Sequence, residues 1–213
     1  MSERVVRHRD AERTRAELLA EATAAFAQTG YSGTTVDDIA QRSSTTKRMI
    51  YYYFGSKEQL YLAVLENSYR EIREAEQRLH VDGLEPVAAL RQIAELTYDH
   101  HLEHRDFVRL VAVENIHYGR FVTQVDSLRE LNAPAVELLD DILRRGHERA
   151  LFRRDIDALD VHLLISSYCV FQIANQHTFE YLFDTDLHSP GRRDHLRQMI
   201  GDVVVSWATA PTE

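Results

Sequence analysis

Cysteine, glycine and proline are all scarce in this chain of 213 residues. Cys169 is the single cysteine, so no disulfide can form within the chain and nothing in the sequence requires an oxidising compartment. The 8 glycines and 4 prolines amount to about half of average usage. A barrel or sandwich of many strands needs a turn every few residues, so this shortage favours long helices.

Apolar runs long enough to enter a membrane are also missing. The longest stretch without Asp, Glu, Lys or Arg covers residues 161–179, and it contains several serine, histidine, glutamine and asparagine side chains. These polar groups are too many for hydrocarbon, and we expect a buried helix there. The first 15 residues lack the apolar segment of a secretory signal. We therefore expect a cytoplasmic protein without a membrane partner.

Positive charge is rare and unevenly placed. Both lysines, Lys47 and Lys57, lie within residues 1–57, which carry a net charge of +2, whereas residues 58–213 carry −11. An acidic body is repelled by nucleic acid, so any polyanion should be met by the N-terminal segment alone.

Apolar periodicity and capping signals predict an all-α fold of about nine helices. Thr35, Thr46 and Ser56 each stand where a helix N-cap is expected. Pro134 is expected to mark a helix boundary, near the start of the helix predicted from residue 132. The predicted helices cover residues 10–28, 36–41, 46–54, 57–79, 85–103, 105–118, 132–149, 157–183 and 190–207. The first three are too small to bury much by themselves, so we expect a small N-terminal domain joined directly to a helical bundle.

The helix predicted at residues 46–54 has two different faces. At about 100° per residue, Ile50 and Phe54 share one face. The opposite face carries two cations and two phenols: Lys47, Arg48, Tyr51 and Tyr52. Such groups donate to phosphate oxygens and base edges, and a short helix, a turn and a second helix of this kind make a helix-turn-helix. The alternative is a solvated helix that happens to be basic.

Residues 30–40 (GYSGTTVDDIA) and 46–58 (TKRMIYYYFGSKE) resemble the DNA-binding signature of the TetR family of transcriptional regulators. The resemblance implies a helix-turn-helix domain in residues 1–56 and a ligand-binding and dimerisation domain in residues 57–213. The chain departs from the family pattern in its turn, which reads SST at 43–45 where Ala-Gly-Val is usual. It also has Arg48 where a small residue is common, and a guanidinium can make a bidentate contact to guanine.

The resemblance also implies roles for single residues. Thr35 and Lys57 would hold backbone phosphates. Base edges would be met by Lys47, Arg48 and Tyr51, with Thr46 beside them, and phosphate and sugar by Tyr52 and Tyr53. The helical wheel places Tyr53 next to the buried stripe. A basic N-terminal arm could enter the minor groove, or be a solvated tail: Arg4, Arg7, His8 and Arg9.

A monomer with one short recognition helix makes too few contacts for selective binding, so we expect a homodimer on a palindromic operator. The last two predicted helices carry the apolar series Leu163, Leu164, Ile165, Val170, Phe171, Ile173 and Leu196, Met199, Ile200, Val203, Val204, Trp207. Gly201 would let a partner helix approach closely. Alternatively, both series face the chain's own core.

The family resemblance further implies a repressor that a small-molecule inducer releases from double-stranded DNA. Polar and aromatic residues at apolar-face spacing are the candidate ligand contacts. They are Tyr98, His101, Leu102, Phe107, Asn115, Tyr118, Phe121, Tyr168, Phe171, Gln172 and Asn175. Aromatic residues at helical spacing more often serve packing than ligand binding, so we expect most of these to be core.

Other classes of function have weaker support. His100 and His104 lie one helical turn apart and could hold a metal in a metal-responsive regulator, but no third ligand is specified nearby. The sequence contains no nucleophile elbow, P-loop, HExxH or dinucleotide motif, so we expect neither an enzyme nor a cofactor. An all-helical adaptor that binds only protein would leave the basic and aromatic stripe without a use.

Overall fold

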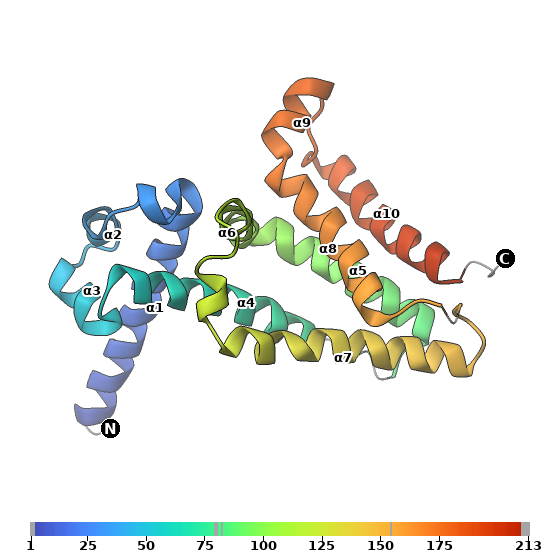
Figure 1. Cartoon of the computed structure of the whole chain (residues 1–213), viewed down its shortest axis with the longest axis horizontal. Coiled ribbons are helices and arrows are strands. Elements are labelled where there is room, and N and C mark those ends of the chain that lie inside the picture. Colours follow the sequence, from blue (N-terminus) through green and yellow to red (C-terminus); the bar gives the residue numbers. More distant parts are fainter. Residues whose placement is uncertain (1–2, 79–80, 82, 154, 210–213) are drawn as a thin grey trace. The chain divides into compact units, whose positions relative to one another are not determined.

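The computed structural model describes residues 3–78, 81, 83–153 and 155–209, with side chains from residue 11 onward. Within these ranges the chain is all-α and has no strand (Figure 1). The elements are α1 (Glu3–Gly33), α2 (Val36–Arg42), α3 (Lys47–Phe54), α4 (Lys57–Gln77), α5 (Pro86–Glu103), α6 (Arg105–Ile116), the 3-10 helix η1 (Val122–Gln124), α7 (Ser127–Glu148), α8 (Ala158–Ala174), α9 (Gln176–Phe183) and α10 (Pro190–Thr209). No helix in the described part is long and apolar enough to cross a membrane.

The chain forms two compact units that do not follow a single cut in the sequence. The first unit comprises Met1–Ser68 and Arg109–Leu128, and the second comprises Tyr69–Val108 and Arg129–Glu213. The first unit therefore includes most of α6 and all of η1 in addition to the three N-terminal helices. The functional boundary between residues 56 and 57 stays a prediction.

An aromatic cluster closes the core of the first unit. The ring of Tyr61 meets Phe26 at 4.9 Å and Phe121 at 5.0 Å, and Tyr31 lies 4.4 Å from Phe121. Gly30 makes this packing possible, because its φ of 70° and ψ of 178° break α1 in a region that only glycine adopts readily. Gly30 lies just past the end predicted for the first helix at residue 28, and in the structure it interrupts α1.

Glu114 on α6 is a buried carboxylate in the same unit, with 4% of its surface exposed. Its Oε1 accepts a hydrogen bond of 2.9 Å from the Tyr61 hydroxyl, and its Oε2 accepts bonds of 3.0 Å from the N–H groups of Phe121 and Val122. Three donors therefore satisfy this carboxylate. They join α4, α6 and the turn before η1 into one core.

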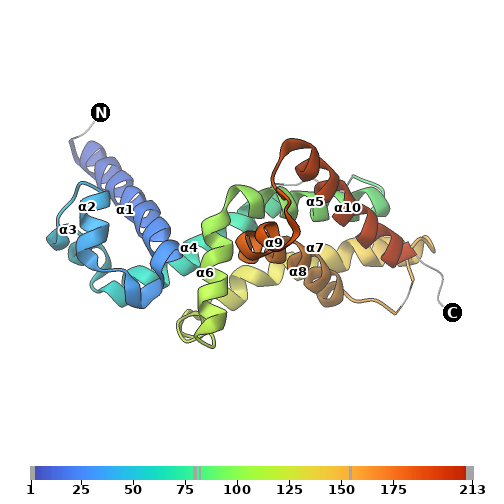
Figure 2. The same cartoon turned by 90° about the horizontal axis from the view of Figure 1, so that it is seen from above.

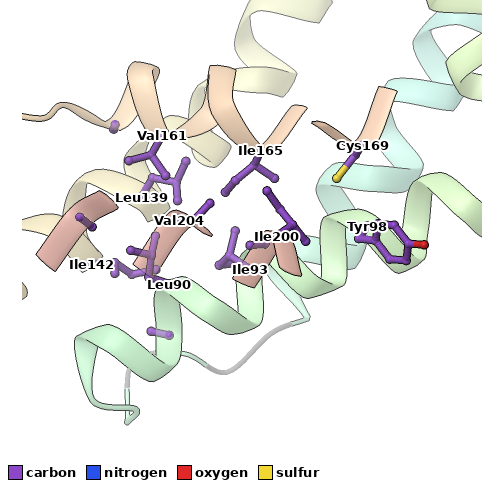
Figure 3. Close-up of a cluster of buried hydrophobic side chains, with 14 of the residues drawn as sticks. Leu90, Ile93, Tyr98, Leu139, Ile142, Val161, Ile165, Cys169, Ile200 and Val204 are labelled. Atoms are coloured by element: carbon purple, nitrogen blue, oxygen red, sulfur yellow. The ribbon is translucent and has the colours of Figure 1, made fainter. Parts of the chain in front are cut away.

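The second unit is built around α5, which packs against both α8 and α10 (Figure 2). Aliphatic side chains from these helices and α7 form its core, as Leu90, Ile165 and Ile200 illustrate (Figure 3). Tyr98 and Cys169 lie at the same end of the labelled cluster. Burial raises the pKa of the Cys169 thiol, so this cysteine is an inert packing group.

Two predictions about where helices break are wrong. The single helix predicted at 157–183 is two helices, because Asn175, with φ −108° and ψ 8°, ends α8 and precedes α9. Asn175 N–H donates to the Phe171 carbonyl, which closes the last turn of α8. Pro134 lies inside α7 and does not separate two helices; buried Leu128 anchors the turns before it. The described chain therefore has ten α-helices where nine were predicted.

Candidate nucleic-acid interface and ligand site

The predicted N-caps of α2 and α3 are confirmed. The Thr35 hydroxyl accepts a bond of 3.2 Å from Asp38 N–H, and the Asp38 carboxylate accepts one of 2.9 Å from Thr35 N–H. This reciprocal pair is a capping box with Asp in place of Glu. Thr46 caps α3 by accepting a bond of 3.3 Å from Met49 N–H. Both threonines are therefore bound to their helices and stay exposed at helix N-termini.

The turn itself contains a strained residue. Ser44 has φ 49°, in the left-handed region that glycine usually occupies. Serine stands there where the family signature usually has glycine. The unusual turn sequence thus keeps the backbone conformation at a cost of about 1 kcal/mol.

The two faces of α3 are confirmed. Ile50 and Phe54 are buried in the first unit's core, whereas Tyr51 is 47% and Tyr52 77% exposed. Tyr53 is half-buried and packs edge-on against Tyr52 with ring centroids 5.2 Å apart. The wheel therefore placed it correctly beside the buried stripe.

The cations near this surface have distinct environments. Lys47 Nζ lies 2.6 Å from a carboxylate oxygen of Asp37, and both side chains are exposed. Arg48 is exposed and makes no ion pair or hydrogen bond within the described part of the chain. Lys57 is half-buried, with Nζ 4.3 Å from the centroid of the Tyr31 ring. Burial lowers the pKa of Lys57, and the charge of Asp38 opposes this shift.

The surface of α3 and the N-terminus of α2 thus present cations, phenols and hydroxyls, which are donors to phosphate and base edges. The backbone of residues 3–9 belongs to α1. The side chains of Arg4, Arg7, His8 and Arg9 lie outside the described residues, so the predicted arm contact is untested.

Two stretches of the chain match known families. Residues 18–64 match the family described as bacterial regulatory proteins, tetR family, and residues 86–204 match the tetracyclin repressor-like C-terminal domain. The chain belongs to the TetR family. It is therefore a DNA-binding transcriptional regulator, and a role in regulation implies that it is no enzyme. Regulators of the TetR family bind DNA as dimers and respond to small-molecule ligands.

Curated relatives and solved structures agree with this assignment. The HTH-type transcriptional repressor NicS of Pseudomonas putida is 37% identical over 182 residues, which cover 85% of this chain and 86% of the relative. KstR2 of Rhodococcus jostii, also named a transcriptional repressor, is 30% identical over 67% of this chain and 70% of its own. The structure of the ketosteroid transcriptional regulator KstR2 of Mycobacterium tuberculosis superposes with a TM-score of 0.70 at 21% identity, covering 92% and 95% of the two chains. This last likeness shows the fold.

In this TetR-family regulator, eight of the eleven candidate ligand contacts lie in the second unit. Five are buried: Tyr98, His101, Leu102, Phe107 and Gln172. Tyr168 is half-buried, whereas Phe171 and Asn175 are exposed. The structure brings some of them together in pairs: Tyr98 with Tyr168 at 6.5 Å between ring centroids, and His101 with Phe107 at 5.5 Å.

The other three candidates belong to the first unit, where each has a local role. Phe121 packs in the aromatic cluster, and Asn115 donates a side-chain bond of 2.8 Å to the Val111 carbonyl. Tyr118 is exposed in a turn with φ 56°. These three therefore belong to a different unit from the other eight candidates. The sequence suggested one set because α6 continues the apolar spacing, although most of that helix packs in the first unit.

Sequence reasoning missed the buried charged pair on α4. Arg73 and Glu76 face the interior of the second unit with side chains 7% and 8% exposed, and Arg73 Nη1 lies 2.9 Å from Glu76 Oε2. A usable signal was present, since opposite charges three residues apart can pair on a helix and Glu76 lies one turn after apolar Ile72. His100, considered only as a metal ligand, is also buried there. Within the described residues no group of three or more His, Cys, Asp or Glu side chains could hold a metal.

The apolar series of the last two helices divides between core and surface. Several members of the two series are buried, as expected if the series face the chain's own core. They are Ile165, Ile173, Leu196, Ile200 and Val204. An exposed apolar strip remains on α8 and α10: Leu159, Leu163, Phe171 and Val203. Two of these residues, Leu163 and Val203, line a groove of about 570 Å³ together with Leu164 and Trp207.

Gly201 lies on the other side of α10, facing α5. A Cβ built on it would lie 2.9 Å from Arg91 Nη1 and 3.1 Å from Glu95 Oε1. The missing side chain therefore admits α5 of the same chain and not a partner helix. The expectation for Gly201 is wrong, because the close approach is internal.

Proposed function

We propose that the protein is a repressor that binds a palindromic operator as a homodimer and leaves it when a small-molecule inducer binds residues 57–213. In this proposal residues 1–56 are the DNA-binding domain. The curated relatives named as repressors support repression over activation. Because the target is the bacterial chromosome, the proposed location is the cytoplasm.

One observation carries the DNA contact: α3 buries Ile50 and Phe54 while it exposes Tyr51 and Tyr52 beside two cations. Adjacent exposed phenols are costly in water without a partner, and they suit base edges and sugar. We assign Lys47, Arg48 and Tyr51 to the bases. Lys57 and the two helix-capping residues, Thr35 and Thr46, are assigned to phosphates. Tyr52 and Tyr53 complete the proposed contact set.

The dimer surface is the strip of Leu159, Leu163, Phe171 and Val203 with its groove. A groove with exposed apolar side chains marks an interaction site, and a second copy is the occupant that a two-fold operator requires. Leu163→Asp should shift the protein from dimer to monomer in sedimentation velocity. Ile116→Asp, at an equally exposed apolar residue of α6, is the control and should stay dimeric.

The decisive experiment measures how two variants, each lacking one cation, bind duplexes selected from a random pool. Lys57→Ala should weaken binding to all duplexes by a similar factor and reduce the slope of log affinity against log salt by about one unit. Arg48→Ala should relax preference at particular base pairs, worth about 1–3 kcal/mol each.

Arg144→Ala, an exposed cation of α7, is the charge-matched control and should leave both properties unchanged. Equal effects of Lys57→Ala and Arg48→Ala on every sequence would refute the division of roles. Absence of binding to any duplex at low salt would refute the proposal itself.

A further inference from the structure

The two lysines of the first unit are held by contacts of different kinds. Lys47 Nζ lies 2.6 Å from a carboxylate oxygen of Asp37. Lys57 forms no ion pair with any residue in the described part of the chain, and its Nζ lies 4.3 Å from the centroid of the Tyr31 ring. A cation this close to a ring face is attracted by the negative charge of that face. The ring of Tyr31 therefore determines where the ammonium of Lys57 lies.

The Tyr31 ring is itself held in place by other rings. Its centroid lies 4.4 Å from Phe121, 5.3 Å from Tyr61 and 6.3 Å from Phe26. These three neighbours are buried, and Tyr31 is half-buried. Side chains in a close-packed interior keep one rotamer, so Tyr31 presents the same ring face to Lys57 at all times.

The backbone before Tyr31 is closed on two sides. Gly30, the preceding residue, breaks α1 with φ 70° and ψ 178°. The buried Thr34 hydroxyl donates a bond of 2.8 Å to the Gly30 carbonyl. On α6, Val113 Cγ1 would lie 3.6 Å from a Cβ built on Gly30, which is ordinary packing distance. The direction in which Tyr31 leaves the chain is thus set by packed and hydrogen-bonded neighbours.

A lysine that is already ordered loses less on binding. The lysine side chain is among the most flexible, and ordering one such side chain in an interface weakens binding by about two- to tenfold. The contact with Tyr31 orders Lys57 in the free protein. The ammonium has three N–H donors and the ring face supplies no acceptor oxygen, so donors remain for a phosphate.

We propose that Tyr31 is a positioning residue for the phosphate contact of Lys57. Its ring holds the ammonium in the same place in the free protein and on the duplex, and Tyr31 itself does not touch DNA. This inference rests on the proposed function, since that function assigns Lys57 to a backbone phosphate.

The first test observes the contact directly. The whole protein is produced with lysine that carries ¹³C in its side chain, and its two lysines give two sets of signals, which Lys47→Arg and Lys57→Arg assign. Protons above an aromatic face are shifted upfield, so the ε-methylene protons of Lys57 should lie upfield of those of Lys47. They should stay upfield when a selected duplex is added. The shift should persist in Tyr31→Phe and disappear in Tyr31→Leu.

The second test measures affinity for the selected duplex. Tyr31→Leu should weaken binding by about two- to tenfold for each subunit, whereas Tyr31→Phe, which keeps the ring, should bind like the parent protein. In the Lys57→Ala background Tyr31→Leu should cause no further loss, because it acts through the missing ammonium.

Phe26→Leu is the matched control for damage to the aromatic cluster. Phe26 is fully buried beside Tyr31 and Tyr61, so this variant should lower the melting temperature. Its Lys57 signal should stay upfield and its affinity for the duplex should stay near that of the parent protein.

Several results would overturn the proposal. A Lys57 signal that is not upfield in the parent protein, or that loses its shift on the duplex, does so even if Tyr31→Leu fails to fold. Tighter binding by Tyr31→Leu would show that the ring withholds Lys57 from DNA. Equal losses from Tyr31→Leu with and without Lys57 would show general damage to the fold.

The two levels of the argument fail in different ways. Unchanged binding of every duplex by Lys57→Ala would overturn the phosphate role in the proposed function, and with it the role of Tyr31. A loss of affinity in Lys57→Ala with none in Tyr31→Leu would overturn the positioning role alone.

Discussion

The two units of this regulator bury a glutamate each and treat it in opposite ways. Glu114 in the first unit accepts three hydrogen bonds from Tyr61, Phe121 and Val122. Glu76 in the second unit has one cation beside it, and that cation keeps an unused donor. The first arrangement is complete without any other molecule, whereas the second is not.

The difference teaches how to separate structural from functional polar groups in a helical regulator. A satisfied buried network rigidifies its surroundings, which suits a unit that must present α3 in one orientation. Unsatisfied buried polar groups lower stability, and each one calls for an explanation of its own. In the described part of the second unit such atoms also occur on Tyr98, Gln172 and His188.

Removing the satisfied carboxylate should give the largest effect. Glu114→Ala leaves one hydroxyl and two backbone N–H donors buried without an acceptor, and should lower the free energy of unfolding by about 5 kcal/mol in urea titrations at fixed protein concentration. Tyr61→Phe removes a single bond and should cost about 1 kcal/mol. Equal, small losses of unfolding free energy for both variants would contradict the role given to Glu114.

Acidification should test the second unit. Burial lowers the pKa of His100 to about 3 and of His101 to about 4, so these rings stay neutral in the folded state while the unfolded rings take up protons below about pH 6.5. Between about pH 7 and pH 5 each ring should cost about 2 kcal/mol of stability. Glu76 acts in the opposite sense, since its raised pKa gives stability as the pH falls through about 7 towards 4.5.

Variants isolate these contributions in urea titrations at the two pH values. His100→Phe should remove about 2 kcal/mol of the acid-induced loss, and Glu76→Gln should enlarge that loss by a similar amount. A loss unchanged in both variants would show that neither group titrates as its burial implies.

A pair of smaller substitutions sharpens the comparison. The buried Thr34 hydroxyl lies 2.8 Å from the Gly30 carbonyl and 3.1 Å from the Ala25 carbonyl, so Thr34→Val should cost about 1–2 kcal/mol. Gln172 Oε1 is buried without a partner, so Gln172→Met should be neutral or stabilising within about 1 kcal/mol. Both changes remove a polar group of similar burial, and melting temperatures compare them directly. A larger loss of stability for Gln172→Met than for Thr34→Val would contradict the difference between the interiors of the two units.

The smallest expected effect concerns the one strained position next to the proposed DNA contacts. Ser44→Gly relieves the left-handed conformation and should stabilise the first unit by about 0.5–1 kcal/mol. Ser43→Gly is the matched control: its φ is −85° and its hydroxyl donates to the Ile39 carbonyl at 2.7 Å, so it should destabilise. Both are read as changes in urea midpoint.

Local signals in the sequence predicted the α3 region well. Caps at Thr35 and Thr46 and the two faces of α3 depend on residues three or four apart, and these contacts form within the element itself. The break at Gly30 was predictable for the same reason.

Contacts between distant segments could not be predicted in this way. Gly201 meets Arg91 and Glu95, which lie more than a hundred residues earlier, and nothing around Gly201 distinguishes that neighbour from a partner subunit. Phe121 likewise joins a core whose other rings lie far away in the sequence. The donors of Arg73 and His100 become informative only when burial and missing partners are known, since both residue types are usually exposed.

The scarcity of lysine has a practical consequence for chemical modification. Amine-directed acylating reagents find side-chain targets only at Lys47 and Lys57, both in the first unit. The lowered pKa of Lys57 leaves more of its amine unprotonated and therefore nucleophilic, although the Tyr31 ring shields it. Acylation erases a positive charge at each site. One reagent can thus test the proposed DNA contacts while no lysine side chain of the second unit is altered.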